Sequence, residues 1–250
     1  MSISGPRKGI EALSGKEVTD TGFLLHRRRL RETSLLLELF TRQHGRVGVV
    51  ARGATQGRKG GQTPLEFTPY YLAWAGTGEL PRLLRAEPAE RAFSLTGERL
   101  FSALYMNELL MRLLQRGEGD ALAFAAYEQS LRHLADGHPL EPVLRHFEAL
   151  LLEACGYGML LAAEGDTGLA LEAEEVYCYA AERGALRQAP NVPHRVVHGG
   201  TLLALAGELP WNEIRLREAK GLMRFLLQPH LGGRPLAARA LFGLASEEQG

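Results

Sequence analysis

The chain has 250 residues, 45% of them hydrophobic, and its formal net charge is zero. This length and hydrophobic content predict a folded chain with a substantial core, arranged as one large domain or two modest ones. A net charge of zero argues against binding of nucleic acid over the whole surface. The two cysteines, Cys155 and Cys178, provide no disulfide framework and fit a reducing cytoplasm. No apolar run approaches the roughly 20 residues that span a bilayer and no secretory signal is present, so we expect a cytoplasmic protein with no membrane partner.

The charges are distributed unevenly along the chain. Between Asp20 and Gly60 there are nine Lys or Arg residues against three Asp or Glu residues. Between Leu161 and Glu182 there are six acidic residues and no basic one. This asymmetry favours one basic working surface on an otherwise balanced protein, and a solvated charged face is the alternative.

The N-terminal third has the pattern of a lead-in followed by strands. Residues 1–19 are rich in Gly, Ser and charge without periodicity, which predicts a poorly ordered segment. Five short segments then have the alternation, composition and flanking turns of strands, and Pro81 favours an edge or bulged position for the last. With one long Gly-rich loop among them, five such strands match a small OB-type barrel. They are Gly22–Arg28, Thr33–Thr41, Val47–Ala51, Phe67–Ala75 and Glu79–Ala86.

After Pro88 the apolar residues recur at helical spacing. Asn212 and Pro235 have the character of helix starts, and the segment before them is irregular apart from a short strand candidate at Val176–Tyr179. The predicted fold class is α+β: a five-stranded OB-fold β-barrel domain at residues 20–90, then a mainly α-helical domain at 91–250 with an irregular insert at about 161–200. The expected helices cover residues 100–114, 121–135, 138–155, 213–228 and 236–245.

The sequence contains no recognisable catalytic motif. Gly53–Gly60 resembles a phosphate-binding loop, but only three residues separate Gly53 from Gly57, and Gly60 stands where a magnesium-binding hydroxyl is needed. Neither a nucleophile elbow nor an HExxH motif occurs. We therefore expect no enzyme activity and no cofactor, with a hydrolase of unrecognised type as an alternative.

Two cysteines and two histidines are possible ligands of a zinc site. The two histidines of the set are separated by three residues, a finger-like spacing. Neither cysteine has a partner within two to four residues, and Cys155 falls on the apolar face of a helix, where free cysteine acts as a small hydrophobe. We expect no bound metal. The four residues are Cys155, Cys178, His194 and His198.

Nucleic-acid binding is the best-supported chemistry. Basic residues lie on or beside the first three strands and the following loop, where an OB-type barrel has its ligand face. Arginines there neutralise phosphates and stack on bases. Tyr70, Tyr71 and Trp74 are stacking candidates, although a core position is the commoner role in a small barrel, and His26 and His44 can contact the same strand or be ordinary surface residues. The basic candidates are Arg27, Arg28, Arg29, Arg31, Arg46, Arg52, Arg58 and Lys59.

A second basic cluster lies near the C-terminus. Arg217, Lys220 and Arg224 fall at positions i, i+3 and i+7 of an expected helix, so they share one face opposite the apolar Leu222 and Leu226. A DNA contact and a merely solvated face are both open for this cluster.

Taken in order, a series of short motifs resembles the RecO family of recombination mediators. Each motif is weak alone, whereas their order and spacing from about Thr21 to Phe242 are specific. The motifs are Thr21–Arg28, Arg31–Leu35, Gly45–Val47, Ala51–Ala54, Phe67–Pro69, Gly76–Leu80, Tyr105–Leu109, Arg145–Glu148, Gly156–Gly158 and Leu231–Leu236.

The resemblance implies an OB-fold, a helical domain and no catalytic turnover. It also implies a nucleoid-associated protein that binds single- and double-stranded DNA, anneals complementary strands, and acts with RecR to help load RecA on DNA coated by single-strand-binding protein (SSB). Many relatives carry two Cys-x-x-Cys pairs after Gly-Tyr-Gly. This chain has Asp166-Thr167-Gly168 and a single Cys178 there, so zinc is not implied. A generic OB-type RNA-binding protein is the alternative function.

An SSB partner requires a docking site for its acidic, hydrophobic-ended tail. Such a tail needs an apolar pocket and an arginine for its terminal carboxylate, because an unpaired buried charge is costly. On the 138–155 helix we expect Arg145 to be exposed beside Leu144, Phe147 and Leu151. Tail binding and a position that merely flanks the core are both open for Arg145.

Overall fold

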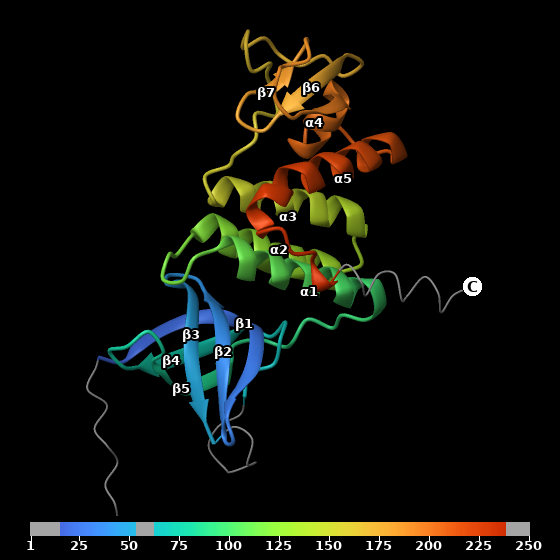
Figure 1. Cartoon of the computed structure of the whole chain (residues 1–250). Coiled ribbons are helices and arrows are strands. Elements are labelled where there is room, and N and C mark those ends of the chain that lie inside the picture. Colours follow the sequence, from blue (N-terminus) through green and yellow to red (C-terminus); the bar gives the residue numbers. More distant parts are fainter. Residues whose placement is uncertain (1–15, 54–62, 239–250) are drawn as a thin grey trace, which may run out of the picture.

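Five strands near the N-terminus close into a barrel. The computed structural model describes residues 16–53 and 63–238, and its barrel strands follow the order β1-β2-β3-β5-β4, with β4 returning to β1 (Figure 1). Strands β3 and β5 are parallel and the other neighbours antiparallel. This is the arrangement of a five-stranded Greek-key barrel of the OB type. The strands are β1 (Val18–Arg31), β2 (Ser34–Thr41), β3 (Gly45–Arg52), β4 (Tyr70–Ala75) and β5 (Arg82–Pro88).

Alternate side chains of these strands fill the barrel, because successive residues of a strand point to opposite sides of the sheet. Leu37 and Leu39 of β2 are fully buried there, and Leu35 packs against the same cluster. Tyr70 and Trp74 of β4 belong to it as well. The side of β2 that carries Leu35, Leu37 and Leu39 therefore faces the barrel interior.

Helices occupy the layers above the barrel in Figure 1, with α5 packed on the side of α3 away from it. The start of α2 is capped by Asp120, whose side chain accepts a hydrogen bond from Ala123 N at 2.7 Å. Asn212 caps α5 as predicted, accepting from Arg215 N at 2.9 Å. The α+β fold class is confirmed. The helices are α1 (Gly97–Leu113), α2 (Ala121–Ala135), α3 (Leu140–Ala154), α4 (Gly199–Leu205), α5 (Glu213–Leu227) and the 3₁₀ turn η1 (Gln228–Leu231).

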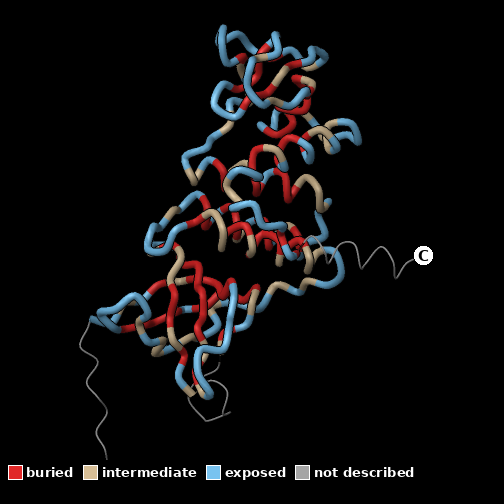
Figure 2. The backbone as a smooth tube through the Cα atoms, viewed as in Figure 1, coloured by how far each residue is buried: buried red, intermediate tan, exposed pale blue. Residues whose placement is uncertain are grey.

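The barrel and the helices share one core. Phe23 and Phe40 project from the barrel onto Tyr127 of α2, with ring centroids 5.3 and 5.9 Å away. Asn107 of α1 donates to the backbone oxygen of Leu25 at 3.1 Å and accepts from the Tyr127 hydroxyl at 2.6 Å. In Figure 2, buried residues lie on both sides of this junction, in the barrel strands and in the helices above them. These contacts therefore fix the orientation of the barrel relative to the helices.

The insert between α3 and α4 holds a small sheet with the order β7-β6-β8. Its inward side chains, Tyr177, Tyr179 and Val197, are buried. Sequence reasoning predicted only the central strand, since the two flanking strands are short and lack alternation. The strands are β6 (Val176–Ala180), β7 (Gly184–Leu186) and β8 (Arg195–His198).

Several predicted element boundaries are wrong. Strand β1 begins four residues before the predicted Gly22, where residues 18–22 pair with β4. Strand β5 begins after Pro81, whose carbonyl accepts a hydrogen bond from Val50 N at 2.8 Å. Helix α4 was missed because its first residues are two glycines, which disfavour a helix. Of the predicted 236–245 helix, only the residues up to 238 are described.

Candidate nucleic-acid interface

The register of the barrel strands defines an outward row of side chains on β1, β2 and β3. His26 lies opposite Glu38, which lies opposite Gly48. In the next row Arg28 and Leu36 are opposite each other. Directly opposed residues share one side of a sheet, and this side is the outer one because the alternate residues Leu37 and Leu39 are inside. We call this surface the barrel face; in OB folds the outer side of strands 2 and 3 contacts nucleic acid.

The four predicted arginines of β1 are exposed, but they do not share one side of the strand. Arg28 lies on the barrel face. Arg27 and Arg29 lie opposite the inward-pointing Leu37 and Leu35, so they project at the rim of the barrel, where Arg27 is 3.8 Å from Glu66. Arg31 ends the strand opposite Ser34. Arg31 is therefore on the barrel face with Arg28, and the register separates these two from Arg27 and Arg29 at the rim.

Two further arginines extend the barrel face. Arg52, which was predicted, lies opposite Ser34 and is exposed. Arg82 of β5 was not predicted; it pairs with Val50 because the barrel closes by a parallel contact between β3 and β5. Reading the β5 arginines against the OB strand order would have found it. Arg58 and Lys59, also predicted, lie outside the described residues.

Arg46 has a structural role instead of the predicted surface one. Its side chain is only 16% exposed, lies 3.6 Å from Glu38, and donates to the backbone oxygen of Met111. Burial lowers the pKa of Arg46, against the attraction of Glu38. We leave Arg46 out of the interface, since the helices cover it.

The three aromatic candidates divide between core and surface. Tyr70 and Trp74 are 5% exposed and belong to the barrel core. Tyr71 is 60% exposed and lines a hollow of about 290 Å³ with Arg85, which pairs with Glu17 at 2.6 Å. Tyr71 is therefore the one of the three that can stack on a base.

His44 is held by the carboxylate of Asp20, which lines the same hollow. Asp20 accepts hydrogen bonds from the backbone N–H groups of Thr21 and Gln43 at 2.7 and 2.9 Å and lies 2.9 Å from His44 Nδ1. Burial acts to raise the pKa of Asp20, but the hydrogen bonds outweigh burial and leave the pKa below its ordinary value. Asp20 thereby fixes the β2–β3 turn against β1.

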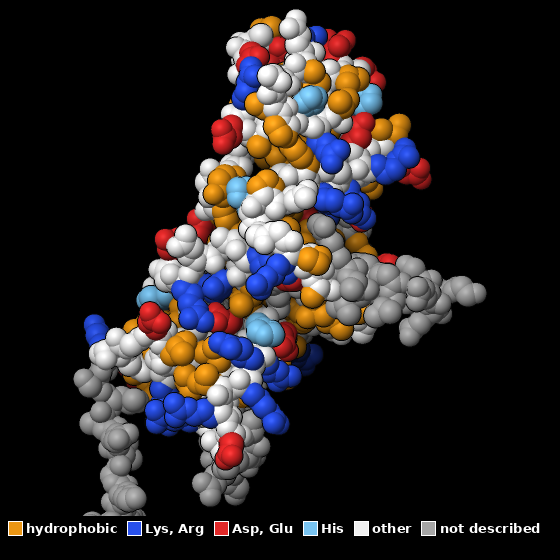
Figure 3. Space-filling view, viewed as in Figure 1, with side chains coloured by type: hydrophobic (Ala, Val, Ile, Leu, Met, Phe, Trp, Pro, Cys, Tyr) orange, Lys and Arg blue, Asp and Glu red, His pale blue; other side chains and the backbone are white. Residues whose placement is uncertain are grey.

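The predicted basic stripe of α5 is exposed. Arg217, Lys220 and Arg224 point away from the buried Leu222 and Leu226, as the helical spacing indicated. Lys220 is paired with Glu141 of α3 at 2.6 Å. Figure 3 shows Lys and Arg side chains on the barrel and a second group where α5 lies. The two basic surfaces are thus separate.

The expectation that Arg145 is exposed is wrong. Its side chain is 6% exposed and pairs with Glu148 at 3.0 Å, and the Glu148 carboxylate accepts from the Tyr105 hydroxyl at 2.5 Å. Leu144, Phe147 and Leu151 are core residues. The error has a physical cause: α3 packs against α1, α2 and α5, so more than one of its sides is covered.

The four residues considered for zinc are not brought together. Within residues 16–53 and 63–238, no three His, Cys, Asp or Glu side chains form a group that could hold a metal ion. His198 Nδ1 instead lies 2.6 Å from Glu218, which also accepts from the Thr201 hydroxyl at 2.5 Å. In the same described ranges, no helix is long and apolar enough to cross a membrane.

Comparison with known families accounts for both halves of the chain. The family description "Recombination protein O N terminal" matches residues 16–92, and "Recombination protein O C terminal" matches residues 94–240. The chain belongs to the RecO family. The DNA repair protein RecO of Methylococcus capsulatus is 43% identical over 247 residues, covering 98% of this chain and 100% of the relative. That of Nitrosococcus oceani is 41% identical over 226 residues, covering 90% and 92%. The resemblance inferred from the sequence motifs is confirmed.

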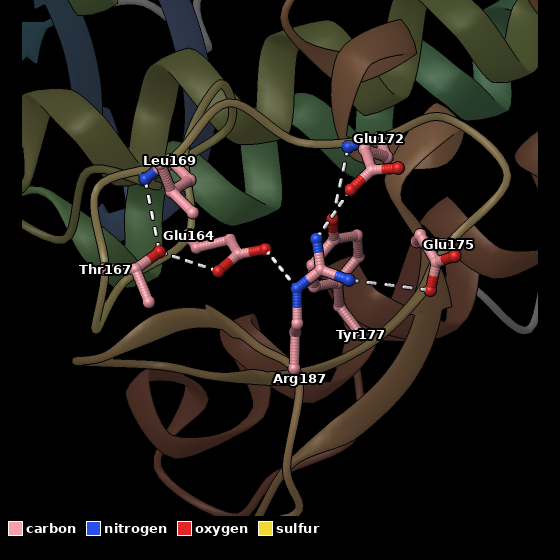
Figure 4. A network of polar contacts seen from close by, with 7 residues as sticks. All are labelled: Glu164, Thr167, Leu169, Glu172, Glu175, Tyr177 and Arg187. Atoms are coloured by element: carbon pink, nitrogen blue, oxygen red, sulfur yellow. Dashed lines mark hydrogen bonds and ion pairs between the residues drawn. The ribbon is translucent and has the colours of Figure 1, made fainter.

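In this RecO family chain, ion pairs hold the insert together (Figure 4). Arg187 donates to Glu164 at 2.6 Å and to Glu172 at 2.7 Å, and lies 3.7 Å from Glu175. Thr167 donates to the other oxygen of Glu164 at 2.6 Å. Its hydrogen bond, together with Arg187, keeps the pKa of the Glu164 carboxyl below its ordinary value. This network ties the end of β7 to the loop after α3.

Proposed function

We propose that this chain is a DNA-binding recombination mediator in DNA repair. It binds single- and double-stranded DNA, anneals complementary strands, and acts with RecR to help load RecA on DNA coated by SSB. The proposal includes no catalytic turnover and a cytoplasmic, nucleoid-associated location. Membership of the RecO family, whose members compared above are named DNA repair proteins, supports the repair role.

The observation that carries the DNA-binding part is the barrel face. Arg28, Arg52 and Arg82 are exposed there, and within residues 16–53 and 63–238 the structure records no carboxylate partner for any of them. An arginine without an intramolecular partner keeps its full charge and hydrogen-bonding capacity for phosphate. Tyr71 adds an exposed ring on the adjoining side of the barrel. Charged groups with a nearby aromatic ring are the usual means of holding a single strand.

Strand annealing tests this function directly. Two complementary labelled oligonucleotides, naked or coated with SSB, should anneal faster with the protein than without it. Matched RNA oligonucleotides serve as competitors, since phosphate contact and stacking are equally available to RNA. Unchanged annealing would overturn the proposal, and stronger competition by RNA than by DNA would favour an OB-type RNA-binding protein.

Because Arg145 is buried, we look for the docking surface of the SSB tail elsewhere. A mostly apolar hollow of about 640 Å³ lies between the insert, the end of α3 and η1. Tyr157, Phe225 and Pro229 line it, and Arg183 lies at its edge in an exposed pair with Asp166. This combination meets both requirements of an acidic tail with apolar last residues, so we propose this hollow as its site.

Titration with a labelled SSB tail peptide tests the site. Arg183→Glu should weaken peptide binding by about 1.5–3 kcal/mol, the range for a hydrogen bond to a charged group. Arg217→Glu, a reversal on the exposed face of α5, is the matched control and should leave peptide binding unchanged. Equal affinity of Arg183→Glu and wild type would remove the hollow from consideration.

A further inference from the structure

The loop between α1 and α2 reaches across to the barrel. Arg116 forms backbone bridges with Gly45 and Arg46, and the N–H of Gly117 donates to Arg46 O at 2.9 Å. The contact is backbone to backbone: a Cβ at Gly45 would lie 1.9 Å from Glu118 O. A Cβ at Gly119 would lie 2.1 Å from Gln43 O. Only glycine fits at these two positions, so the loop is fixed closely on the β2–β3 turn.

These backbone contacts of the loop place the Arg116 side chain on the barrel face. Its Nε donates to one oxygen of Glu38 at 3.2 Å, and its Nη2 donates to the other. Glu38 projects outward from β2 and its side chain is 8% exposed. One edge of the guanidinium is thereby fixed by a two-point hydrogen bond, which also sets the orientation of its plane.

The plane lies flat over Gly48. A Cβ at Gly48 would be 2.8 Å from Cζ, 2.8 Å from Nη2 and 3.1 Å from Nε of Arg116. Three guanidinium atoms at nearly equal distances mean that the group faces the strand with its plane instead of pointing at it. The absence of a side chain at Gly48 provides the space. The side chain of Arg116 remains 37% exposed, so part of it is accessible to a ligand.

We propose that Arg116 is a base-stacking residue that the helical domain contributes to the barrel face. This inference rests on the proposed function and specifies how single-stranded DNA is bound. Guanidinium planes stack on bases, and a plane already held parallel to the sheet loses little freedom on stacking. Glu38 compensates the charge, which favours a stacked base over a phosphate on this side chain. Arg28, one row further along the face, is left for the phosphate.

Three variants separate stacking from charge. Arg116→Lys keeps the charge and loses the plane, Arg116→Ala loses both, and Gly48→Ala keeps the arginine but displaces it from the strand. Each should weaken binding of a single-stranded oligonucleotide about fivefold or more, the lower limit for losing one stacked base. The dependence of the affinity on salt should stay as in wild type, because no phosphate contact is lost.

Three other results would contradict the inference, and each has a different consequence. Wild-type affinity in all three variants would remove Arg116 from the site while the proposed function stands. Wild-type affinity in Arg116→Lys, with a slope in log[salt] about 0.7 shallower in Arg116→Ala, would mean a phosphate contact instead. No binding of single-stranded DNA by the wild type would overturn the function and the inference together. Thermal unfolding checks each variant, and Gly48→Ala keeps the test valid if loss of the Glu38 partner unfolds Arg116→Ala.

Discussion

On the barrel, Arg28, Arg52 and Arg82 are exposed, and among the residues that the structure describes they have no carboxylate partner. In the helical half and its insert, two arginines are instead held by acidic neighbours: Arg145 pairs with Glu148, and Arg187 with Glu164. The same side chain thus has two roles in one protein. Arg145 and Arg187 are held by carboxylates and stabilise the structure, whereas Arg28, Arg52 and Arg82 remain available to a ligand.

Among these arginines, charge reversal should lower the free energy of unfolding most at Arg145. Arg145→Glu places two buried carboxylates side by side, because Glu148 is 1% exposed. Breaking a buried pair costs about 3–5 kcal/mol, which is a large share of the roughly 5–15 kcal/mol by which folded proteins are stable. Arg28→Glu is the matched control and should change the free energy of unfolding by less than about 0.5 kcal/mol. Urea unfolding of both variants measures the difference, and equal stabilities would contradict the assignment of roles.

A smaller effect is expected at Asp20, which fixes the β2–β3 turn. Asp20→Asn should lower the free energy of unfolding by about 1–2 kcal/mol at neutral pH, since a charged acceptor is lost. The folded-state pKa of Asp20 lies below its ordinary value of about 3.9, so its stabilisation is present above that pH. It is lost as the pH falls through the folded-state pKa.

The measurement is urea unfolding of wild type and Asp20→Asn between pH 7 and pH 3. The difference in stability should shrink below about pH 4 as the wild-type carboxylate becomes protonated. A difference that grows on acidification would mean that Asp20 is destabilising in its ionised form.

The smallest expected effect concerns the insert. The Arg187 network holds the segment together without a metal ligand set, so a chelator should leave the melting temperature unchanged and elemental analysis should find no stoichiometric zinc. Arg187→Ala should instead increase hydrogen exchange in the insert. One zinc per chain would contradict this, and would direct attention to Cys155, Cys178, His194 and His198.

The sequence predicted the barrel, the helices and the exposed arginines of β1, because alternation and helical spacing are local signals. It did not predict the setting of Arg145, since burial of that side of α3 depends on which helices pack there. Arg82 and Arg116 were missed for a related reason. Arg82 joins the barrel face because the barrel closes between β3 and β5, and Arg116 reaches it from the loop between α1 and α2. Such placements are set by tertiary contacts that spacing alone does not contain.

The central claim is that the barrel face binds single-stranded DNA through unpartnered arginines. Its most direct test is the salt dependence of binding for wild type, for Arg28, Arg52 and Arg82 changed together to alanine, and for Arg217, Lys220 and Arg224 changed together to alanine. With roughly 4 phosphates neutralised, the wild-type slope of log K against log[salt] should be near −3, at about −0.7 per contact. The barrel variant should have a slope of about −1 and the α5 variant a slope close to wild type. A wild-type slope in the barrel variant, with a shallower one in the α5 variant, would place the DNA on α5 and contradict the account.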